Sequence, residues 1–407
     1  MKITLADTEE ARRILLKVID PTPLVPNQWL SNKIGCDVYL KLENMQPIGS
    51  FKIRGAVYKL STLNPATRKR GVIAASAGNH AQGVAWAAAH FQTKATIVMP
   101  QSAPLTKIQN TKALGAKIIL YGDKYEEAYA QARKLERETG ATFVHPFEDA
   151  QVIAGQGTVG LEIVEQLPDA DVLIGAVGGG GLMGGIGIVM KALKPKTMLV
   201  GAQASGASSM VQSLRKHRVV RTREAETFAD GIRVKNVSPA LFRILNRVID
   251  LAADADDEKI AAAVLTLMEK AHTIAEGAGA LPLAVLEDLM IQRPRDFRRK
   301  KVVLVICGGN IDVNVLGRII DHGLILNGRR VRLNVSISDR PGSLNLLTRI
   351  IAENGANVLQ VIHDRDKPAV GFNETGVEMT LETRGPEHGR TLVAAIKKHF
   401  PKLEFFH

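Results

Sequence analysis

Aromatic residues and cysteine are both scarce in this sequence. Only 4% of the 407 residues are Phe, Trp or Tyr, which argues against a surface that stacks nucleic-acid bases. The two cysteines, Cys36 and Cys307, offer no disulfide framework, so we expect a protein of the reducing cytoplasm. Residues 1–10 carry several charges and no apolar core, and therefore predict no signal peptide.

Long apolar runs and a concentrated basic region are also missing. The charge-free run at 172–190 is too rich in glycine to hold a stable lipid-facing helix, so we expect a soluble protein without membrane contacts. The formal net charge of +12 is spread along the chain. Its densest cluster precedes an apolar strand and is interpreted as a solvated loop, so no nucleic-acid partner is expected. The cluster consists of Arg293, Arg295, Arg298, Arg299, Lys300 and Lys301.

Short apolar strands alternate with helical patterns over most of the chain. A chain of 407 residues exceeds one ordinary core, so two or three domains are expected. Strands such as 72–75 and 172–177 are apolar throughout, which predicts an α/β fold of doubly wound parallel sheets covered on both faces. Ligands of such folds gather at the carboxyl ends of the strands.

The pattern changes near Asn327-Gly328. Apolar residues alternate strictly from Val331 to Ile337, which predicts a half-buried strand. Pro341 is expected to be the first residue of a helix that ends at Gly355. Two strands, a second helix and a last strand then complete a small βαββαβ module. We expect these strands at 358–362, 377–381 and 403–405, with the helix around 392–400.

One lysine, Lys52, lies among small and apolar residues in the stretch from Ser50 to Gly55. A lysine in a partly dry pocket loses proton affinity, and its free amine can form a Schiff base with an aldehyde cofactor. The motif is weak by itself, because the chain has 53 Lys and Arg residues and most charged side chains are exposed.

A run of glycines, Gly178 to Gly181, followed by Leu182, lies between an expected strand and an expected helix. Successive glycine amides and a helix start together make a cradle for a phosphate group. The run is neither a P-loop nor a dinucleotide fingerprint. A tight turn required only for packing is an equally weighted alternative.

Two further loops follow strands. The amides of Ser76-Ala77-Gly78-Asn79-His80 could hold a carboxylate and Asn79 could donate to a ring oxygen, although an ordinary helix cap is the favoured interpretation of this motif alone. Cys307 begins the loop Cys307-Gly308-Gly309-Asn310. A buried cysteine is usually a small hydrophobic residue, and its functional alternative is a weak hydrogen-bond partner for a ring nitrogen.

In their order along the chain, the lysine stretch, the loop at 76–80, the glycine run and the cysteine loop resemble the motifs of the fold-type-II pyridoxal-phosphate enzymes. The resemblance is strongest to the threonine dehydratases (threonine ammonia-lyases). The resemblance covers the whole chain. It implies a two-lobed, tryptophan-synthase-β-like catalytic domain at 1–322, with a smaller lobe at about 51–154 inserted in the larger one. A linker at 323–328 and a regulatory ACT domain at 329–407 would follow.

The same resemblance implies the chemistry. Pyridoxal 5'-phosphate would be the cofactor, and L-threonine would undergo β-elimination and deamination to 2-oxobutanoate and ammonia, with L-serine giving pyruvate. Lys52 would be the catalytic residue and the backbone of residues 76–80 would bind the substrate carboxylate. The residues implied to bind the cofactor are Phe51, Lys52, Asn79, Gly178, Gly179, Gly180, Gly181, Leu182 and Cys307.

The segment from Asp339 to Leu344 resembles the entry motif of an ACT domain. Such a domain implies an amino-acid effector, isoleucine or valine, and a homo-oligomer, either a dimer or a tetramer. The effector would contact Asp339, Gly342, Leu344 and Asn357.

Two departures from relatives narrow the expected reaction. Ala77 stands where serine racemases have a second acid/base serine, so racemisation should be weak. Gln203 and Ser209 stand where some relatives bind a divalent cation, so no metal site is expected. The alternatives are a degradative serine/threonine dehydratase, a serine racemase and, from another class, a catalytically silent amino-acid sensor. The intact Lys52 stretch counts against the sensor.

Overall fold

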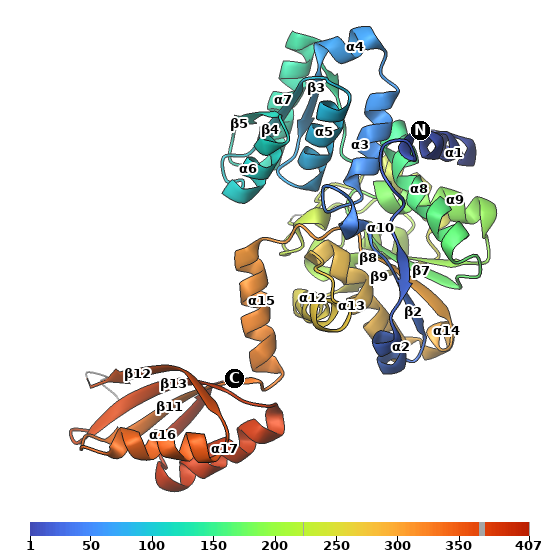
Figure 1. Cartoon of the computed structure of the whole chain (residues 1–407). Helices are drawn as coiled ribbons and strands as arrows, with labels where there is room; N and C mark the ends of the chain where they lie inside the picture. The colour runs from blue at the N-terminus through green and yellow to red at the C-terminus, as the bar shows by residue number, and fades with distance from the viewer. Residues whose placement is uncertain (223, 366–370, 407) are drawn as a thin grey trace. The chain divides into compact units, whose positions relative to one another are not determined.

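The structure of the protein is a computed structural model that describes residues 1–222, 224–365 and 371–406. It divides into two compact units, Met1–Asp312 and Val313–His407 (Figure 1). The expected boundary at 322 and the expected linker at 323–328 need correction. A continuous helix, α15 (Val313–Leu326), includes position 322 and residues 323–326 of the expected linker, and it clusters with the second unit.

A six-stranded sheet forms the larger lobe of the first unit, in the order β1-β2-β10-β7-β8-β9. Its strands pair in parallel except for β1, which runs antiparallel to β2. Helices α12 and α13 lie on one side of this sheet and helices α8 and α9 on the other (Figure 1). The strands are β1 (Leu24–Pro26), β2 (Asp37–Lys41), β7 (Val172–Ala176), β8 (Met198–Ala204), β9 (Leu251–Ala255) and β10 (Lys301–Val305). The four helices are α8 (Ala150–Gln166), α9 (Gly181–Leu193), α12 (Asp257–Lys270) and α13 (Gly277–Gln292).

A four-stranded parallel sheet, ordered β5-β4-β3-β6, forms the smaller lobe and lies between β2 and β7 in sequence. Alternate residues of β3 enter two different cores, because Val72 and Ala74 pack with α5 while Ile73 and Ala75 pack with α7. Burial on both faces is what makes this strand apolar throughout. The strands are β3 (Val72–Ala75), β4 (Ala95–Met99), β5 (Lys117–Leu120) and β6 (Thr142–Phe143). The helices are α3 (Lys52–Ser61), α4 (Pro65–Arg70), α5 (Asn79–His90), α6 (Leu105–Ala113) and α7 (Tyr125–Thr139). The expected doubly wound α/β fold is confirmed.

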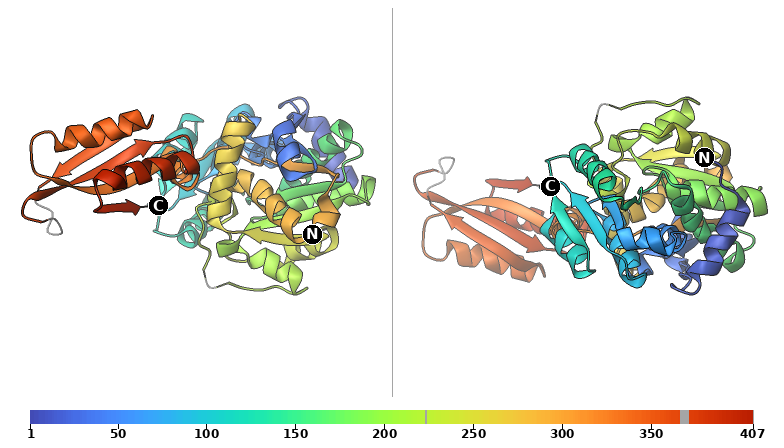
Figure 2. Two further views of the ribbon diagram at one scale, coloured as in Figure 1. Left: turned by 90° about the horizontal axis from the view of Figure 1, so that it is seen from below. Right: turned by 90° about the horizontal axis from the view of Figure 1, so that it is seen from above.

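After α15, the second unit has the expected βαββαβ order, with an antiparallel sheet β12-β13-β11-β14. Helices α16 and α17 both pack on one face of this sheet (Figures 1 and 2). The expectation that Pro341 opens a helix is wrong: Gly342 adopts a left-handed φ of +93°, so α16 begins only after it. The elements are β11 (Arg330–Ser338), α16 (Ser343–Glu353), β12 (Asn357–Asp364), β13 (Glu374–Glu382), α17 (Pro386–His399) and β14 (Leu403–Phe406).

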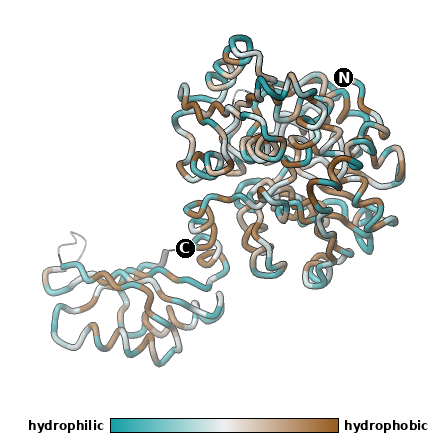
Figure 3. Tube along the Cα trace, turned by 45° about the horizontal axis from the view of Figure 1, so that its top comes forward, coloured by the Kyte–Doolittle hydropathy of each residue, from teal (hydrophilic) through white to brown (hydrophobic). Residues whose placement is uncertain are grey.

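The charge-free run at 172–190 is divided between strand β7, the glycine loop and helix α9. In the described part of the chain, no helix is long and apolar enough to cross a membrane. Polar and apolar segments alternate over short distances along the chain (Figure 3). The remaining helices of four residues or more are α1 (Leu5–Leu15), α2 (Gln28–Ile34), α10 (Ser209–Arg215), α11 (Pro239–Val248) and α14 (Pro294–Phe297).

Candidate active site

Lys52 is the first residue of α3 and meets the carboxyl end of β10. Ser50 forms an isolated antiparallel bridge with Gly308, and the Phe51 amide donates to the Cys307 carbonyl at 3.1 Å. These two contacts join the lysine stretch to the cysteine loop, although the two motifs are far apart in sequence. The structure therefore brings Phe51, Lys52 and Cys307 together.

The Lys52 side chain is half-buried between a backbone carbonyl and an aromatic ring. Its Nζ donates to the Pro146 carbonyl at 3.0 Å and lies 5.2 Å from the centroid of the Phe51 ring. Desolvation lowers the pKa of Lys52 to about 8, and nearby Cys307 and Glu276 oppose this shift. Only an unprotonated amine can attack an aldehyde or remove a proton, and this lowered pKa makes that form accessible near neutral pH.

Buried charges fix the first turn of α3. Arg54 is 1% exposed, and its Nε donates to Glu43 at 2.7 Å while its Nη2 donates to Glu162 at 2.8 Å. Glu162 also accepts from buried Lys41 at 2.6 Å. Because these partners come from β2, η1 (Glu43–Met45) and α8, the network ties the helix that begins at Lys52 to the larger lobe. The sequence analysis missed this network.

The glycine loop is both tightly packed and rich in open amides. A side chain on Gly179 would begin 2.3 Å from the Phe147 ring, and Gly180 has a φ of +97° at the start of α9. Among the described residues, no acceptor is hydrogen-bonded to the amides of Gly178, Gly179 and Gly180. The first-turn amides of α9, at Gly181 and Leu182, have no intrahelical partner either. Packing explains the glycines, and the open amides fit a phosphate group.

Residues 146 and 147 connect the glycine loop with the lysine. The Pro146 carbonyl accepts from the Lys52 amine, and the adjacent Phe147 lies against Gly179 and Gly181. The lysine stretch, expected to bind an aldehyde, and the glycine loop, expected to bind a phosphate group, therefore border the same site.

The loop at 76–80 presents fewer open amides than expected. The Ser76 amide donates to the Val98 carbonyl at 3.2 Å, and the Gly78 amide donates to the Ser76 hydroxyl at 3.2 Å. The expectation that all five amides hold a carboxylate is corrected accordingly. The amides of Ala77, Asn79 and His80 have no acceptor among the described residues, and they remain available at the start of α5.

Only the backbone of His80 is suited to substrate binding. Its side chain is buried and its Nε2 lies 2.9 Å from the Val144 carbonyl in the smaller lobe. Burial, with a smaller contribution from nearby Lys52, lowers the pKa of His80 to about 3, so its imidazole is neutral.

Cys307 is buried at the end of β10, where desolvation raises the pKa of its thiol far above the usual range. The thiol therefore keeps its proton at physiological pH. A neutral thiol is a weak hydrogen-bond partner and supplies no negative charge to a ring nitrogen.

Two polar residues that the sequence analysis did not single out also contact Asn79. The Asn79 Nδ2 donates to Glu276 at 2.8 Å, and the Asn310 Nδ2 donates to the Asn79 Oδ1 at 2.8 Å. Glu276 directly precedes α13, and its amide donates to the Gly308 carbonyl at 3.0 Å. The sequence did contain one relevant pattern, an acidic residue directly before the small residues Gly277 and Ala278.

The positions where some relatives bind a cation are engaged within the protein. The Gln203 Oε1 accepts from the Val211 amide at 2.8 Å, and the Ser209 hydroxyl donates to the Val234 carbonyl at 3.2 Å. In residues 1–222, 224–365 and 371–406, no group of three or more His, Cys, Asp or Glu residues could hold a metal ion.

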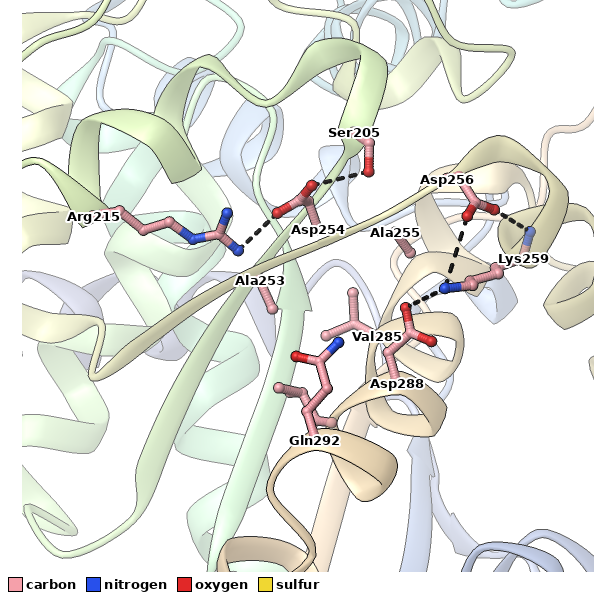
Figure 4. A pocket seen from close by; sticks show the side chains of 11 residues that line it. Ser205, Arg215, Ala253, Asp254, Ala255, Asp256, Lys259, Val285, Asp288 and Gln292 are labelled. Atoms are coloured by element: carbon pink, nitrogen blue, oxygen red, sulfur yellow. Dashed lines mark hydrogen bonds and ion pairs between the residues drawn. The ribbon is translucent and has the colours of Figure 1, made fainter.

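A cavity of about 290 Å³ lies elsewhere in the first unit, between α10, β9, α12 and α13 (Figure 4). Its charged residues pair with one another, since Arg215 contacts Asp254 at 2.7 Å and Lys259 contacts Asp288 at 2.8 Å. None of the four motifs lines this cavity. We therefore assign the candidate active site to the Lys52 region instead.

The basic cluster near 293–301 is partly neutralised. Lys300 pairs with Asp171 at 3.1 Å and Arg293 pairs with Asp296 at 2.7 Å, while Lys301 pairs with Asp169 at 2.5 Å. These ion pairs reduce the positive potential that a phosphate backbone would meet.

The four expected effector residues do not come together within a single copy of the second unit. Asp339 follows β11 and pairs with Arg365 at 3.1 Å, while Gly342 and Leu344 lie at the start of α16. Asn357 opposes Glu382, whereas Ser338 opposes Glu374 at the other end of β13. Asn357 is therefore at the opposite end of the sheet from Asp339.

Comparison with known proteins relates these observations to a family. The family model described as pyridoxal-phosphate dependent enzyme matches residues 15–308. An L-threonine ammonia-lyase of Thermotoga maritima is 47% identical, with 95% of each chain covered. The structure of the processed form of threonine deaminase isoform 2 from Solanum lycopersicum is 34% identical with a TM-score of 0.71, covering 79% of this chain and 90% of that one. The structure of maize serine racemase is 29% identical with a TM-score of 0.75, covering 81% of this chain and 100% of that one. The chain therefore belongs to the family of pyridoxal-phosphate dependent enzymes.

Proposed function

We propose that the chain is an L-threonine ammonia-lyase that produces 2-oxobutanoate and ammonia, and that it also converts L-serine to pyruvate. The observation that carries this proposal is the desolvated Lys52 amine, which lies between the cysteine loop and the glycine loop. The similarity to an L-threonine ammonia-lyase over 95% of the chain supports the choice of substrate. Serine lacks only one methyl group, and such a difference discriminates by roughly 10- to 200-fold.

The residues present fit pyridoxal phosphate. Lys52 would carry it covalently, the open amides of 178–182 would hold its phosphate, and Phe51 would border it. Asn79 would donate to its ring oxygen and the neutral Cys307 thiol would face its ring nitrogen. When bound, the cofactor supplies an electron sink for the bond broken at the substrate Cα.

Lys52 is the base in this proposal. When its amine is free, Lys52 would take the Cα proton, which its lowered pKa allows near neutral pH. The open amides of Ala77, Asn79 and His80 would hold the substrate carboxylate, while the Pro146 carbonyl accepts a hydrogen bond from the Lys52 amine. The proton taken from Cα would balance the departure of the β-hydroxyl as water, and hydrolysis of the resulting enamine would then release 2-oxobutanoate and ammonia.

Serine racemase is the second candidate, because maize serine racemase has a similar structure. A racemase needs an acid on the face opposite Lys52 to return a proton. Ala77 occupies the position that we compared with the second serine of racemases, and its methyl side chain has no proton to donate. We therefore favour elimination, with D-serine formation slow or absent.

The second unit is proposed to be an ACT domain that binds isoleucine or valine. Its βαββαβ order and the Asp339 to Leu344 motif support this assignment. Since Asn357 lies far from Asp339 in one unit, an effector that contacts both would need two copies of the chain. We propose a homo-oligomer for this reason, and a cytoplasmic location because both cysteines are free.

The decisive experiment is steady-state keto-acid production by the purified protein from L-threonine and L-serine, each with and without isoleucine. Chiral analysis of residual serine in the same samples measures racemisation. We expect 2-oxobutanoate and pyruvate with little D-serine. A protein that makes D-serine faster than pyruvate is a racemase. A protein that makes neither product while binding isoleucine is a sensor.

A further inference from the structure

The side-chain amide of Asn79 lies between two polar residues whose roles have not been assigned above. Asn310 donates to the Asn79 Oδ1, and Glu276 accepts from the Asn79 Nδ2, each at 2.8 Å. We propose that Asn310 and Glu276 are positioning residues that hold this amide with its NH₂ group toward the cofactor. The inference rests on the proposed role of Asn79 in contacting the ring oxygen.

A backbone carbonyl fixes the orientation of the Asn310 amide, which in turn fixes that of the Asn79 amide. Asn310 donates its Nδ2 to the Ile48 carbonyl at 2.7 Å, and a carbonyl oxygen can only accept. The NH₂ group of Asn310 must therefore face Ile48, and its second hydrogen meets the Asn79 Oδ1. Rotating the Asn79 amide by half a turn would place two NH₂ groups against each other.

The other end of the chain of hydrogen bonds is a carboxyl group. Glu276 accepts one hydrogen of the Asn79 NH₂, so the second hydrogen remains for a ligand. Asn79 thus has its oxygen fixed by a donor and one N–H fixed by an acceptor. The amide can present only an N–H, and never its oxygen, to a ring oxygen beside it.

Two glycines leave the space that this arrangement needs. A side chain on Gly308 would begin 2.5 Å from the Glu276 Oε1 and 3.2 Å from the Asn79 Nδ2. A side chain on Gly49, whose φ is +69°, would begin 2.5 Å from the Asn310 Oδ1. The glycine after Cys307 and the asparagine two residues further on therefore serve the same hydrogen-bond chain.

Charged groups on several elements surround Glu276. Burial raises its pKa to about 7, Lys107 of α6 and Lys52 of α3 oppose this rise, and Asp230 of η3 (Asp230–Ile232) adds to it. The neutral Cys307 thiol also lies near Glu276. A protonated carboxyl group still has an acceptor oxygen, so the Asn79 contact does not depend on the charge of Glu276.

The test uses full-length protein loaded with pyridoxal phosphate and four substitutions. Asn310→Asp replaces the donor by an acceptor, and Glu276→Leu removes the acceptor, while Glu276→Gln keeps an acceptor oxygen. Asn64→Asp is the matched control, because Asn64 caps the exposed helix α4 and Asp caps equally well. The readouts are cofactor dissociation by dialysis, the visible absorption band of bound cofactor, and kcat and KM.

We expect Asn310→Asp and Glu276→Leu each to weaken cofactor binding roughly tenfold and to shift the absorption band, since each disrupts one hydrogen bond. Glu276→Gln and Asn64→Asp should keep the band and the affinity of the unchanged protein. If Glu276→Gln is impaired as severely as Glu276→Leu, Glu276 acts as an acid or base and the positioning role is wrong. An unchanged band in Asn310→Asp would also overturn the proposal.

A double-mutant cycle separates positioning from a general loss of structure. If Asn310 acts through Asn79, Asn310→Asp should add nothing to the loss of cofactor affinity caused by Asn79→Ala. Additive losses between variants that circular dichroism shows to be folded would contradict the proposal. Cofactor affinity and the absorption band are measured without substrate. Failure of the ammonia-lyase assignment would therefore leave this result interpretable.

Discussion

The two units of the chain arrange their expected functional residues in opposite ways. In the first unit, motifs separated by more than two hundred residues meet through bonds such as Asn310 to Asn79 and Ser50 to Gly308. In the second unit, Asp339 and Asn357 are close in sequence but lie at opposite ends of the sheet. Parallel strands bring their carboxyl ends to one edge, whereas an antiparallel sheet distributes its loops over two. A catalytic site can therefore be complete in one copy of the first unit.

The largest effect should come from Lys52. Replacing Lys52 by Ala removes both the cofactor attachment and the base, and loss of a general base alone costs 10²- to 10⁴-fold, so we expect at least about a thousandfold loss of 2-oxobutanoate production. Lys112→Ala, at an exposed position of α6, is the control and should retain full activity. Substantial activity in Lys52→Ala would mean that another residue is the base.

Arg54 should have the next largest effect, on stability. Arg54→Met leaves two buried carboxylates without their main partner, which costs about 3–5 kcal/mol of unfolding free energy. Arg215→Met breaks a half-exposed pair with Asp254 and should cost only about 0–1 kcal/mol. Denaturant titration of both variants measures the difference. Equal losses would show that the buried network does not hold α3 in place.

Lys52 and Arg54 also show which features could be predicted from the sequence and which could not. Lys52, the glycine loop and the alternation of buried strands follow from local patterns, because each needs only its own neighbours in sequence. The Arg54 network does not, since Glu162 lies on another helix and no local spacing pairs the two. Glu276 and Asn310 were missed for the same reason: their contacts with Asn79 exist only after the strands have come together.

Strand β9 and helix α15 are two of the elements that the sequence patterns did not predict. Strand β9 reads Leu-Ala-Ala-Asp-Ala, and alanine and aspartate disfavour strands, so its pairing with β8 rather than its composition makes it a strand. Helix α15 (Val313–Leu326) occupies a stretch where no helix was predicted and where the end of the catalytic domain and the start of the linker were expected. Tertiary context decided both cases.

The pH dependence of cofactor uptake should follow the Lys52 amine. Since its pKa is lowered from 10.5 to about 8, the reactive free amine is the major form above about pH 8. Cofactor capture by the apoprotein should slow roughly tenfold per pH unit below that value and level off above it. Stopped-flow absorbance measures this rate. A plateau reached only near pH 10 would show that the amine is not desolvated.

The smallest effect is expected from metal removal. Gln203 and Ser209 are engaged with backbone groups and offer only neutral oxygens, which hold a hard cation poorly. Dialysis against a chelator should leave keto-acid production unchanged. A loss of activity that added magnesium reverses would identify a cation site in this region.

The comparison between the two units is tested most directly by a chain shortened to residues 1–312. Circular dichroism and bound-cofactor absorption first establish that it folds, and 2-oxobutanoate production from L-threonine is then measured with and without isoleucine. Our account predicts that the shortened chain retains keto-acid production and no longer responds to isoleucine. A folded, cofactor-bound chain of residues 1–312 that produces no 2-oxobutanoate would contradict it.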